Sequence, residues 1–373
     1  MAHDGRNIDA ALGLLEGEAA LQRIESPEAE HPPRAVLPED PAQAQASGES
    51  TTYYGLPAIK EPVWIWTVPT YFFVGGLAGA CNVLGAAAHA FGGEKLRPLV
   101  LRARWTGAVG DALSAVLLIS DLGRPTRFLN MLRVFRPSSP MSVGSWILAA
   151  CGALSGASAL FGFSKGLLGR FGDLSSYLAA VLGLPLAGYT GVLLANTAVP
   201  VWQGGRKALP VLFMGSAAAS AGAFLELIAK REEGAAAARR FGTVGKAAEL
   251  VAGFAYEREV GTAVERVARP LSQGVSGTLW KTARGLTVAS LGLSLLPGLA
   301  RWKRVAAGLT GLAGALALRF AIFHAGKASA RDPRATFEQQ RAGQGAEEIT
   351  GPKFDQIPAD YTVPYEGAYP EPG

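Results

Sequence analysis

The segment that decides the fold class, residues 63–93, reads VWIWTVPTYFFVGGLAGACNVLGAAAHAFGG and contains no Asp, Glu, Lys or Arg. Residues 141–164 and 174–205 are equally free of charge. A helix needs roughly 20 residues to cross a hydrocarbon core of about 30 Å, and each of these segments is long enough. Only helices and closed barrels satisfy their backbone in lipid, and these segments lack the strict alternation of barrel strands. The sequence therefore predicts an all-α, polytopic membrane protein.

Working outward from that segment, we expect about eight spans, arranged as two four-helix halves. The predicted spans are 64–91, 103–122, 142–164, 174–199, 207–229, 243–264, 278–299 and 304–325. The sixth is unusual because it contains Lys246 and Glu249 and ends in a cluster of charges. It fits either a span lined by protein or an amphipathic helix on the membrane surface, and we prefer the span. Pro185 inside the fourth span predicts a kink.

Polar tails flank the apolar middle of the chain. The first tail starts without the basic and apolar regions of a signal peptide and continues into an acidic stretch rich in Pro, Ala and Ser, as linkers do. Its apolar residues are spaced to line one face of a short amphipathic helix: Ile8, Leu12, Leu15 and Ile24. We predict three parts: a partner-docking or disordered tail (1–62), the membrane bundle (63–325) and a polar, Pro-rich tail (326–373).

The formal net charge of +5 comes from Lys and Arg residues scattered among many loops. This distribution fits loops that face anionic lipid and argues against a nucleic-acid partner. Basic residues are about equally frequent in the loops at both ends of the spans, so the positive-inside rule does not orient the protein. We name the end of the bundle at which the first span begins side A, and the opposite end side B.

The cysteines and histidines argue against a redox cofactor in this chain. Cys81 and Cys151 lie inside apolar spans without metal-ligand spacing, and two cysteines cannot hold an iron–sulfur cluster by themselves. A b-type haem needs two histidines at one depth on facing helices. With eight spans, His89 lies at side B and His324 at side A, whereas with seven spans they would share a side. We expect no haem, no iron–sulfur cluster and no metal.

The loop after the second span is rich in arginine. Residues 121–146 read DLGRPTRFLNMLRVFRPSSPMSVGSW, with Asp121 at the end of the span and three prolines further along. The arginines of this loop are Arg124, Arg127, Arg133 and Arg136. Such a loop is compatible with an ordinary solvated interface, but prolines and interleaved apolar residues favour arginines held in fixed positions.

This loop resembles the signature of the polysulfide-reductase membrane-subunit family, the NrfD-type subunits. Three further segments are similar to spans of that family: YYGLPAIKEPVWIWTVPTYFFVGGLAGA (53–80), YTGVLLANTAVPVW (189–202) and LRFAIFHAGKASARDP (318–333). The resemblance covers roughly residues 53–335. It implies a bundle of about eight helices without a redox cofactor of its own. It also implies a quinone or quinol site near the face where an iron–sulfur subunit docks, with a molybdenum enzyme or a multihaem cytochrome beyond that subunit.

A quinone head group needs hydrogen-bond donors, a group that exchanges protons, and aromatic or apolar walls. Eight spans bring all three to side A, so we place menaquinone or ubiquinone there. Asp121 would exchange the proton, Arg124, Arg127 and Arg319 would orient the head group or hold the partner, and Trp66 and Tyr71 would line the pocket. Arg319 has an alternative reading, a structural salt bridge with Asp121.

Quinone chemistry also needs a route for protons. The carboxyl groups placed to form one are Asp111, Asp121, Glu226 and Glu249. For Asp111, in the middle of the second span, we prefer this functional reading. For Glu226, near the side B end of its span, we prefer the alternative of a residue that snorkels to water; the corresponding alternative for Glu249 is a side chain that faces water.

Two other functional classes remain. An ion or solute transporter would use Asp111 and Glu249 as coupling sites, but it predicts paired broken helices in an inverted repeat, and only the span with Pro185 is interrupted. A passive membrane anchor predicts the loss of the side A acid, yet Asp121 is present. The leading hypothesis is a quinone-reactive subunit of a respiratory oxidoreductase in the bacterial cytoplasmic membrane.

Overall fold

The computed structural model describes residues 7–9, 14–16, 59–122, 126–296 and 301–341. These residues form twelve helices, α2 to α13, and two short strands. The strands β1 (Asn7–Asp9) and β2 (Leu14–Glu16) pair antiparallel, with Ile8 opposite Leu15. The amphipathic helix expected here is therefore wrong for Ile8 and Leu15, because both residues lie in paired strands. Leu12 and Ile24 lie outside the described residues.

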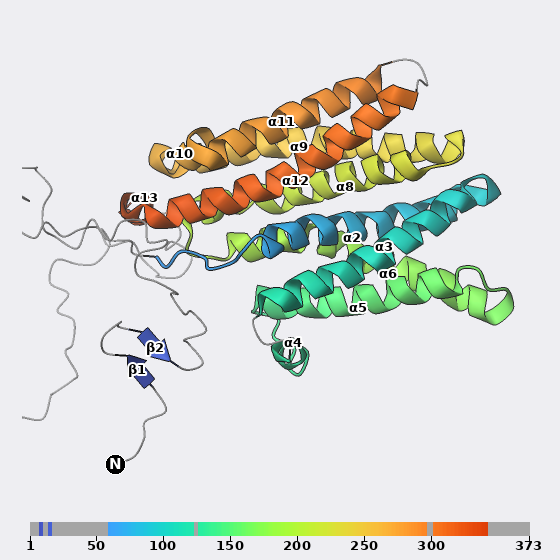
Figure 1. The fold of residues 1–373 in the computed structure, drawn as a ribbon, viewed down its shortest axis with the longest axis horizontal. Helices are drawn as coiled ribbons and strands as arrows, with labels where there is room; N and C mark the ends of the chain where they lie inside the picture. Colours follow the sequence, from blue (N-terminus) through green and yellow to red (C-terminus); the bar gives the residue numbers. More distant parts are fainter. Residues whose placement is uncertain (1–6, 10–13, 17–58, 123–125, 297–300, 342–373) are drawn as a thin grey trace, which may run out of the picture.

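Eight long helices build the bundle, as expected (Figure 1). They are α2 (Thr67–Phe91), α3 (Gly93–Asp121), α5 (Pro140–Phe161), α6 (Gly166–Ala195), α8 (Ala208–Ile228), α9 (Glu232–Ala263), α11 (Gly274–Leu295) and α12 (Arg301–Arg331). The helices α2, α3, α5 and α6 pack together as a first half, and α8, α9, α11 and α12 as a second half. The halves meet mainly where α8 lies against α2 and α6, and where α12 lies against α2.

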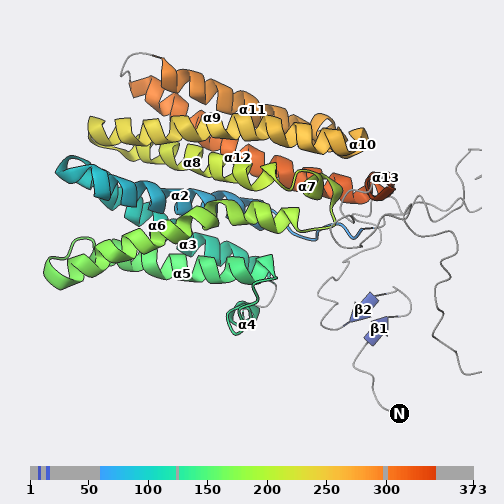
Figure 2. The ribbon, with the colours of Figure 1, turned by 180° about the vertical axis from the view of Figure 1, so that it is seen from behind.

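Five of these helices are long and apolar enough to cross a membrane by length and composition: α2, α5, α6, α8 and α12. The other three long helices, α3, α9 and α11, have no stretch that is equally apolar over the length of a span. The helix α9 contains residues 243–263 of the predicted sixth span (243–264) and runs alongside α8 within the bundle (Figure 2). Buried charges explain its polar composition, because Lys246 is 2% exposed and Glu249 is 4% exposed.

Glycine and serine set the boundaries of several helices. Gly93, Gly166 and Gly274 open α3, α6 and α11 with positive φ angles, which glycine adopts without steric cost. Because α3 begins two residues after α2 ends, these two helices form a tight antiparallel hairpin. The first turn of α5 is capped by the side chain of Ser139, which accepts a hydrogen bond from the backbone N–H of Ser142.

Small residues let the helices approach closely. A methyl group added at Gly183 of α6 would lie 2.5 Å from the carbonyl oxygen of Gly79 in α2, so the two backbones are in direct contact. The same close approach joins α8 and α9 at Gly222 and Gly242. Backbone contact of this kind holds helices together in lipid, where hydrophobicity alone does not drive association.

Short helices gather at side A. These are α4 (Arg127–Met131) beside the first half, and α7 (Pro200–Gly204), α10 (Glu265–Ser272) and α13 (Pro333–Arg341) at the end of the second half (Figure 2). Residues 59–66, the strap, lead into α2 across this end. In the strap, Glu61 pairs with Arg331 at 2.6 Å and Trp64 stacks on Trp202 at 6.0 Å. The predicted boundary at residue 325 falls inside α12.

Candidate functional site

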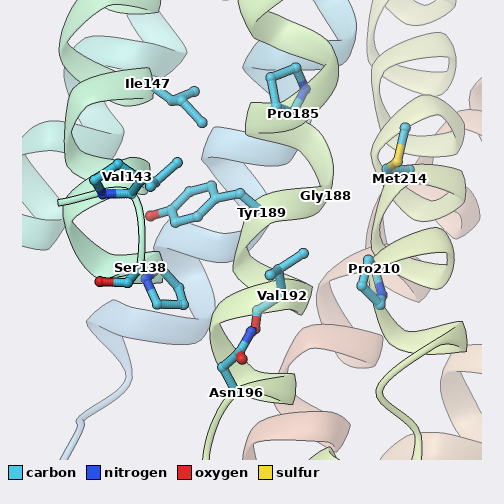
Figure 3. A pocket seen from close by; sticks show the side chains of 12 residues that line it. Ser138, Val143, Ile147, Pro185, Gly188, Tyr189, Val192, Asn196, Pro210 and Met214 are labelled. Atoms are coloured by element: carbon cyan, nitrogen blue, oxygen red, sulfur yellow. The ribbon is translucent and has the colours of Figure 1, made fainter. Parts of the chain in front are cut away.

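A groove of about 490 Å³ runs along the outer face of α6, between α5 and α8 (Figure 3). Its α6 wall consists of residues three or four positions apart, which share one face of the helix: Pro185, Gly188, Tyr189, Val192 and Asn196. The α5 side adds Pro137, Ser138, Pro140, Val143 and Ile147, and α8 adds Pro210 and Met214. Because α6 ends at side A, the groove extends from the interior of the bundle to the side A end, over about 16 Å.

Two glycines of α6 bring this helix into close contact with α8 at the groove. Gly188 lies against the side chain of Met214, and Gly191 lies against the backbone of Pro210. A methyl group at either glycine would come within 2.7 or 2.8 Å of those atoms, so α6 and α8 are already in contact beneath the groove. The lining is mostly apolar, with the polar groups of Tyr189, Asn196 and Ser138 as exceptions. This is the composition of a site for a largely apolar small molecule.

A pair of phenols connects the groove with the interior of the first half. The ring of Tyr189 extends from α6 toward Val143 of α5, where it packs on Gly144 (Figure 3). Its hydroxyl group is in hydrogen-bond contact with the hydroxyl group of Tyr71 in α2. Tyr71 is 2% exposed and lies behind Tyr189 as seen from the groove. Any ligand that touches the Tyr189 hydroxyl is therefore one hydrogen bond away from the interior.

Tyr71 was predicted as a site residue, but Tyr189 was not. The sequence did contain a signal, because Tyr189 opens the segment YTGVLLANTAVPVW that resembles the family. In a single sequence, however, a functional tyrosine in an apolar span cannot be distinguished from one that only packs against neighbouring helices. Its importance depends on contacts with α2 and α5, which lie far away in the chain.

The predicted acid Asp121 ends α3 at side A, where the Thr67 hydroxyl donates to its Oδ1 atom at 3.1 Å. Trp66, which precedes α2, is 62% exposed at the same end. Thr67 precedes Tyr71 by one helical turn, about 6 Å. Arg124 lies outside the described residues. Arg127 opens α4, and its side chain is also outside what the structure describes.

Arg319 lies between the two halves and is 1% exposed. Its Nη2 atom donates to the Phe213 carbonyl of α8 at 3.0 Å, and its Nε atom donates to the Phe72 carbonyl of α2 at 3.5 Å. The guanidinium also lies 3.9 Å from the centre of the Phe213 ring. Thus the structure pairs Asp121 with Thr67 and Arg319 with carbonyl groups, in place of the salt bridge between them considered from the sequence. Arg319 contacts the residue that follows Tyr71.

Asp111 lies in a polar cluster inside the first half and is 1% exposed. Its Oδ2 atom accepts hydrogen bonds from Asn82 of α2 at 3.2 Å and from Ser155 of α5 at 2.7 Å. The Cys151 thiol is 3.6 Å from the same oxygen. The other carboxylate oxygen, Oδ1, is buried without a hydrogen-bond partner. Asn82 lies about 22 Å from the side A end of α2 and about 14 Å from the side B end, so the cluster is well inside the bundle.

Glu226 and Glu249 lie in the second half, apart from Asp111. Glu226 is 2% exposed and pairs with Arg239 at 3.4 Å, so it does not snorkel to water as the sequence suggested. Glu249 accepts a hydrogen bond from Thr287 at 2.7 Å. Lys246, one turn before Glu249 on α9, donates to Ser294 at 2.8 Å. The structure therefore places the four predicted proton carriers in three locations: side A, the first half and the second half.

Cofactor ligands are sparse in the described part of the chain. There, no group of three or more His, Cys, Asp or Glu residues is placed to hold a metal ion. Cys81 and Cys151 are buried and free. His89 lies near the side B end of α2, and His324 lies near the side A end of α12, next to Phe323. The two histidines are at opposite ends of the bundle.

Fold and site together define a class: a polytopic helical membrane protein with an apolar groove on its flank and a phenol pair at the groove wall. The sequence matches the polysulfide reductase family of NrfD type over residues 50–331. The chain belongs to this family and is an integral membrane protein. Membership implies a membrane subunit of a multisubunit reductase and an interaction with quinone. No curated protein matches the chain closely enough to count as a relative.

Proposed function

We propose that this chain is the quinone-reactive membrane subunit of a respiratory oxidoreductase complex in the bacterial cytoplasmic membrane. All eight long helices cross the membrane in this proposal, including α3, α9 and α11, whose charges are largely paired or buried. The division into an N-terminal tail (1–62), a membrane bundle (63–325) and a C-terminal tail (326–373) belongs to the proposal, with the tails as contacts for partner subunits.

The groove beside Tyr189 is the observation that carries the proposal. It opens on the flank of the bundle, where a lipid-soluble molecule reaches it from the bilayer, and its apolar lining suits an isoprenoid tail. The Tyr189 hydroxyl is the polar group on its α6 wall that is coupled to the interior, through Tyr71. A quinone carbonyl that accepts a hydrogen bond from Tyr189 would be held at the end of this phenol pair.

The chemistry at this site balances as quinone plus two electrons and two protons giving quinol, or the reverse. The electrons come from, or go to, an iron–sulfur subunit docked at side A, because this chain has no redox cofactor of its own in our proposal. That subunit connects to a molybdenum enzyme or a multihaem cytochrome. The exposed apolar and aromatic residues at side A, including Trp66, Leu129 and Phe135, support a protein contact at this face.

The remaining predicted residues take supporting roles. Asp121, hydrogen-bonded to Thr67, exchanges protons at the side A end of the site, and Arg124 and Arg127 hold the head group or the partner. Arg319 fixes α2 against α8 next to Tyr71 and so positions the site. Asp111 is placed to carry protons in the first half, and Glu226 and Glu249 are the candidate carriers of the second half.

Transport is less well supported than quinone chemistry. A transporter of the inverted-repeat type needs paired, interrupted helices at its binding site. The helix α6 continues through Pro185, and α3 continues through Pro98. Among the described helices, these two prolines do not create the pair of broken segments that such a mechanism uses.

Tyr189→Phe tests the proposal directly, because it removes one hydroxyl group and leaves the ring in place. The purified complex, with its iron–sulfur partner, should reduce or oxidise quinone with a kcat/KM about tenfold lower or worse, since a lost hydrogen bond to the reacting group costs about 1–3 kcal/mol. Electron transfer between the partner and an artificial dye should be unchanged.

Leu184→Val is the matched control, because Leu184 is exposed on α6 outside the groove. It should retain the wild-type rate with quinone. A complex that does not react with quinone, or a Tyr189→Phe variant as active as Leu184→Val, would contradict the assignment of the site.

A further inference from the structure

The side B end of the first half holds a charged cluster that the site described above does not use. Arg104 of α3 donates to Asp173 of α6 at 2.8 Å, and its Nη2 atom lies 3.4 Å from Nδ1 of His89 in α2. His89 is also 3.7 Å from Asp173 and stacks on Tyr177. The Arg104 side chain is 4% exposed, but those of His89 and Asp173 are 33% and 41% exposed. The cluster is therefore open to side B and reaches into the bundle.

Buried polar atoms without a hydrogen-bond partner lead from this cluster toward the phenol pair. In the first half they are Arg104 Nε, Ser158 Oγ, Asp111 Oδ1 and Ser114 Oγ. On α3, Asp111 lies two turns from Arg104, about 10 Å, and Ser114 lies about 5 Å further toward side A. Ser158 lies one turn toward side B from Ser155, the residue that donates to Asp111. The four atoms thus follow one another along the interior of the first half.

The last step of this line reaches Tyr71. Ser114 packs beside Gly75 of α2, since a methyl group added at Gly75 would lie 3.2 Å from Ser114 Oγ and 3.6 Å from the Tyr71 ring. Tyr71 in turn contacts the hydroxyl of Tyr189 at the wall of the groove. The line connects an opening at side B with the groove near side A.

Physical chemistry gives these atoms a common explanation. A buried polar group without a partner costs free energy, and almost all such groups in proteins bond to protein or to ordered water. Water occupies buried sites where several polar groups converge. Gly75 and Gly152 leave Ser114 and Asp111 uncovered by a side chain: a methyl group at these positions would lie 3.2 Å from Ser114 Oγ and 3.7 Å from Asp111 Cβ. Bridging water molecules would satisfy the four atoms and link them into one hydrogen-bonded chain.

We propose that the first half contains a water-bridged proton route from side B, with His89 and Asp173 as its entrance, Asp111 as its central carrier, and Ser114 and Tyr71 as its last steps. The inference rests on the proposed quinone chemistry, in which each quinone gains two electrons from the iron–sulfur partner and two protons. Because the groove lies toward side A and the protons come from side B, turnover moves charge across the membrane.

The second half offers a competing line. Three buried charged residues lie in this half: Glu226, Lys246 and Glu249. It also contains buried atoms without a hydrogen-bond partner, Glu249 Oε2 and Arg319 Nη1. This line ends at Arg319, which contacts the carbonyl groups of Phe72 and Phe213 rather than a hydroxyl of the phenol pair. The first half alone leads to Tyr71, and for this reason we assign the route to it.

The test uses the complete complex, with its iron–sulfur partner, reconstituted in vesicles. A reduced viologen supplies electrons to the partner, a membrane quinone accepts them, and pH dyes report separately on the two compartments. In the wild type, the protons consumed should disappear from the side B compartment. Asp111→Asn and Ser114→Ala should each slow proton uptake and quinone reduction about tenfold or more and raise the solvent isotope effect, while reduction of the partner's clusters keeps its wild-type rate.

Asp173→Asn and His89→Gln should slow the same uptake, and Asp173→Glu should restore part of it. Glu94→Gln is the matched control, because Glu94 is an exposed acid at side B that pairs with nearby Arg97, and it should behave as wild type. Ser114→Ala keeps the test valid if Asp111→Asn fails to fold.

Proton uptake from the side A compartment would overturn this inference but not the proposed function. The same holds if the first-half variants take up protons as fast as the control while Glu249→Gln takes them up slowly. A wild-type complex that does not react with quinone would overturn both.

Discussion

Arg319 illustrates how this bundle keeps a charge in its interior. A buried guanidinium is tolerated when its donors reach acceptors, and here two carbonyl groups and an aromatic face receive it. Lysine offers a compact ammonium that cannot donate to both carbonyls and lie flat over Phe213. We therefore expect Arg319→Lys to lower the stability of the detergent-solubilised protein by about 2 kcal/mol, measured by thermal unfolding. Arg301→Lys, at an exposed position, should change nothing, and equal melting temperatures for both variants would contradict this reading.

Single residues are also where sequence reasoning is weakest. Asp111 could be predicted as buried because it lies in the middle of a span, and Tyr71 because it follows the start of the first one. The groove could not be predicted, since it arises where Pro185, Gly188 and Pro210 on two helices leave space. The side B cluster was missed for the same reason: Arg104 and Asp173 are far apart in the chain and meet only in the folded bundle.

At the scale of elements, most of the architecture follows from the sequence. Apolar segments predict α2, α5, α6, α8 and α12 because lipid selects for uncharged runs. The helix α9 was harder to assign, because a search for uncharged segments takes no account of the partners that charged residues have in the folded protein. Its charged residues include Lys246 and Glu249, which point into the second half and find Ser294 and Thr287 there.

Helix contacts give a second prediction. Gly183→Ala places a methyl group 2.5 Å from the Gly79 carbonyl oxygen, and this atom belongs to the backbone, so it cannot turn away. We expect the substitution to force α2 and α6 apart at a cost of about 1–3 kcal/mol, seen as a lower melting temperature and yield. Gly156→Ala on α5 is the control, because a methyl group there meets no atom within 4 Å, and it should be neutral or slightly stabilising. Equal behaviour of the two variants would argue against direct contact between the backbones.

At the scale of the whole molecule, the strap joins the first span to the last. Glu61 receives two hydrogen bonds from Arg331 and lies 3.7 Å from Lys327, while Trp64 stacks on Trp202. The ion pair is partly exposed, so its contribution to global stability is small. Its effect is local: it fixes the entrance to α2 a few residues before Trp66 and Tyr71.

Glu61→Gln should therefore leave the melting temperature nearly unchanged but accelerate hydrogen exchange in residues 59–66. Glu265→Gln, an exposed acid at the start of α10, serves as the control. If exchange in the strap is the same in both variants, the ion pair does not hold it in place.

The central claim is that quinone binds in the groove beside Tyr189, and a photoreactive quinone tests it most directly. The native complex is illuminated with an azidoquinone, and the labelled peptides are mapped by mass spectrometry. Labelling should fall on 137–147, 185–196 and 210–214, should be competed by unmodified quinone, and should decrease in Tyr189→Phe. Specific labelling confined to the second half, or none that unmodified quinone displaces, would contradict the account.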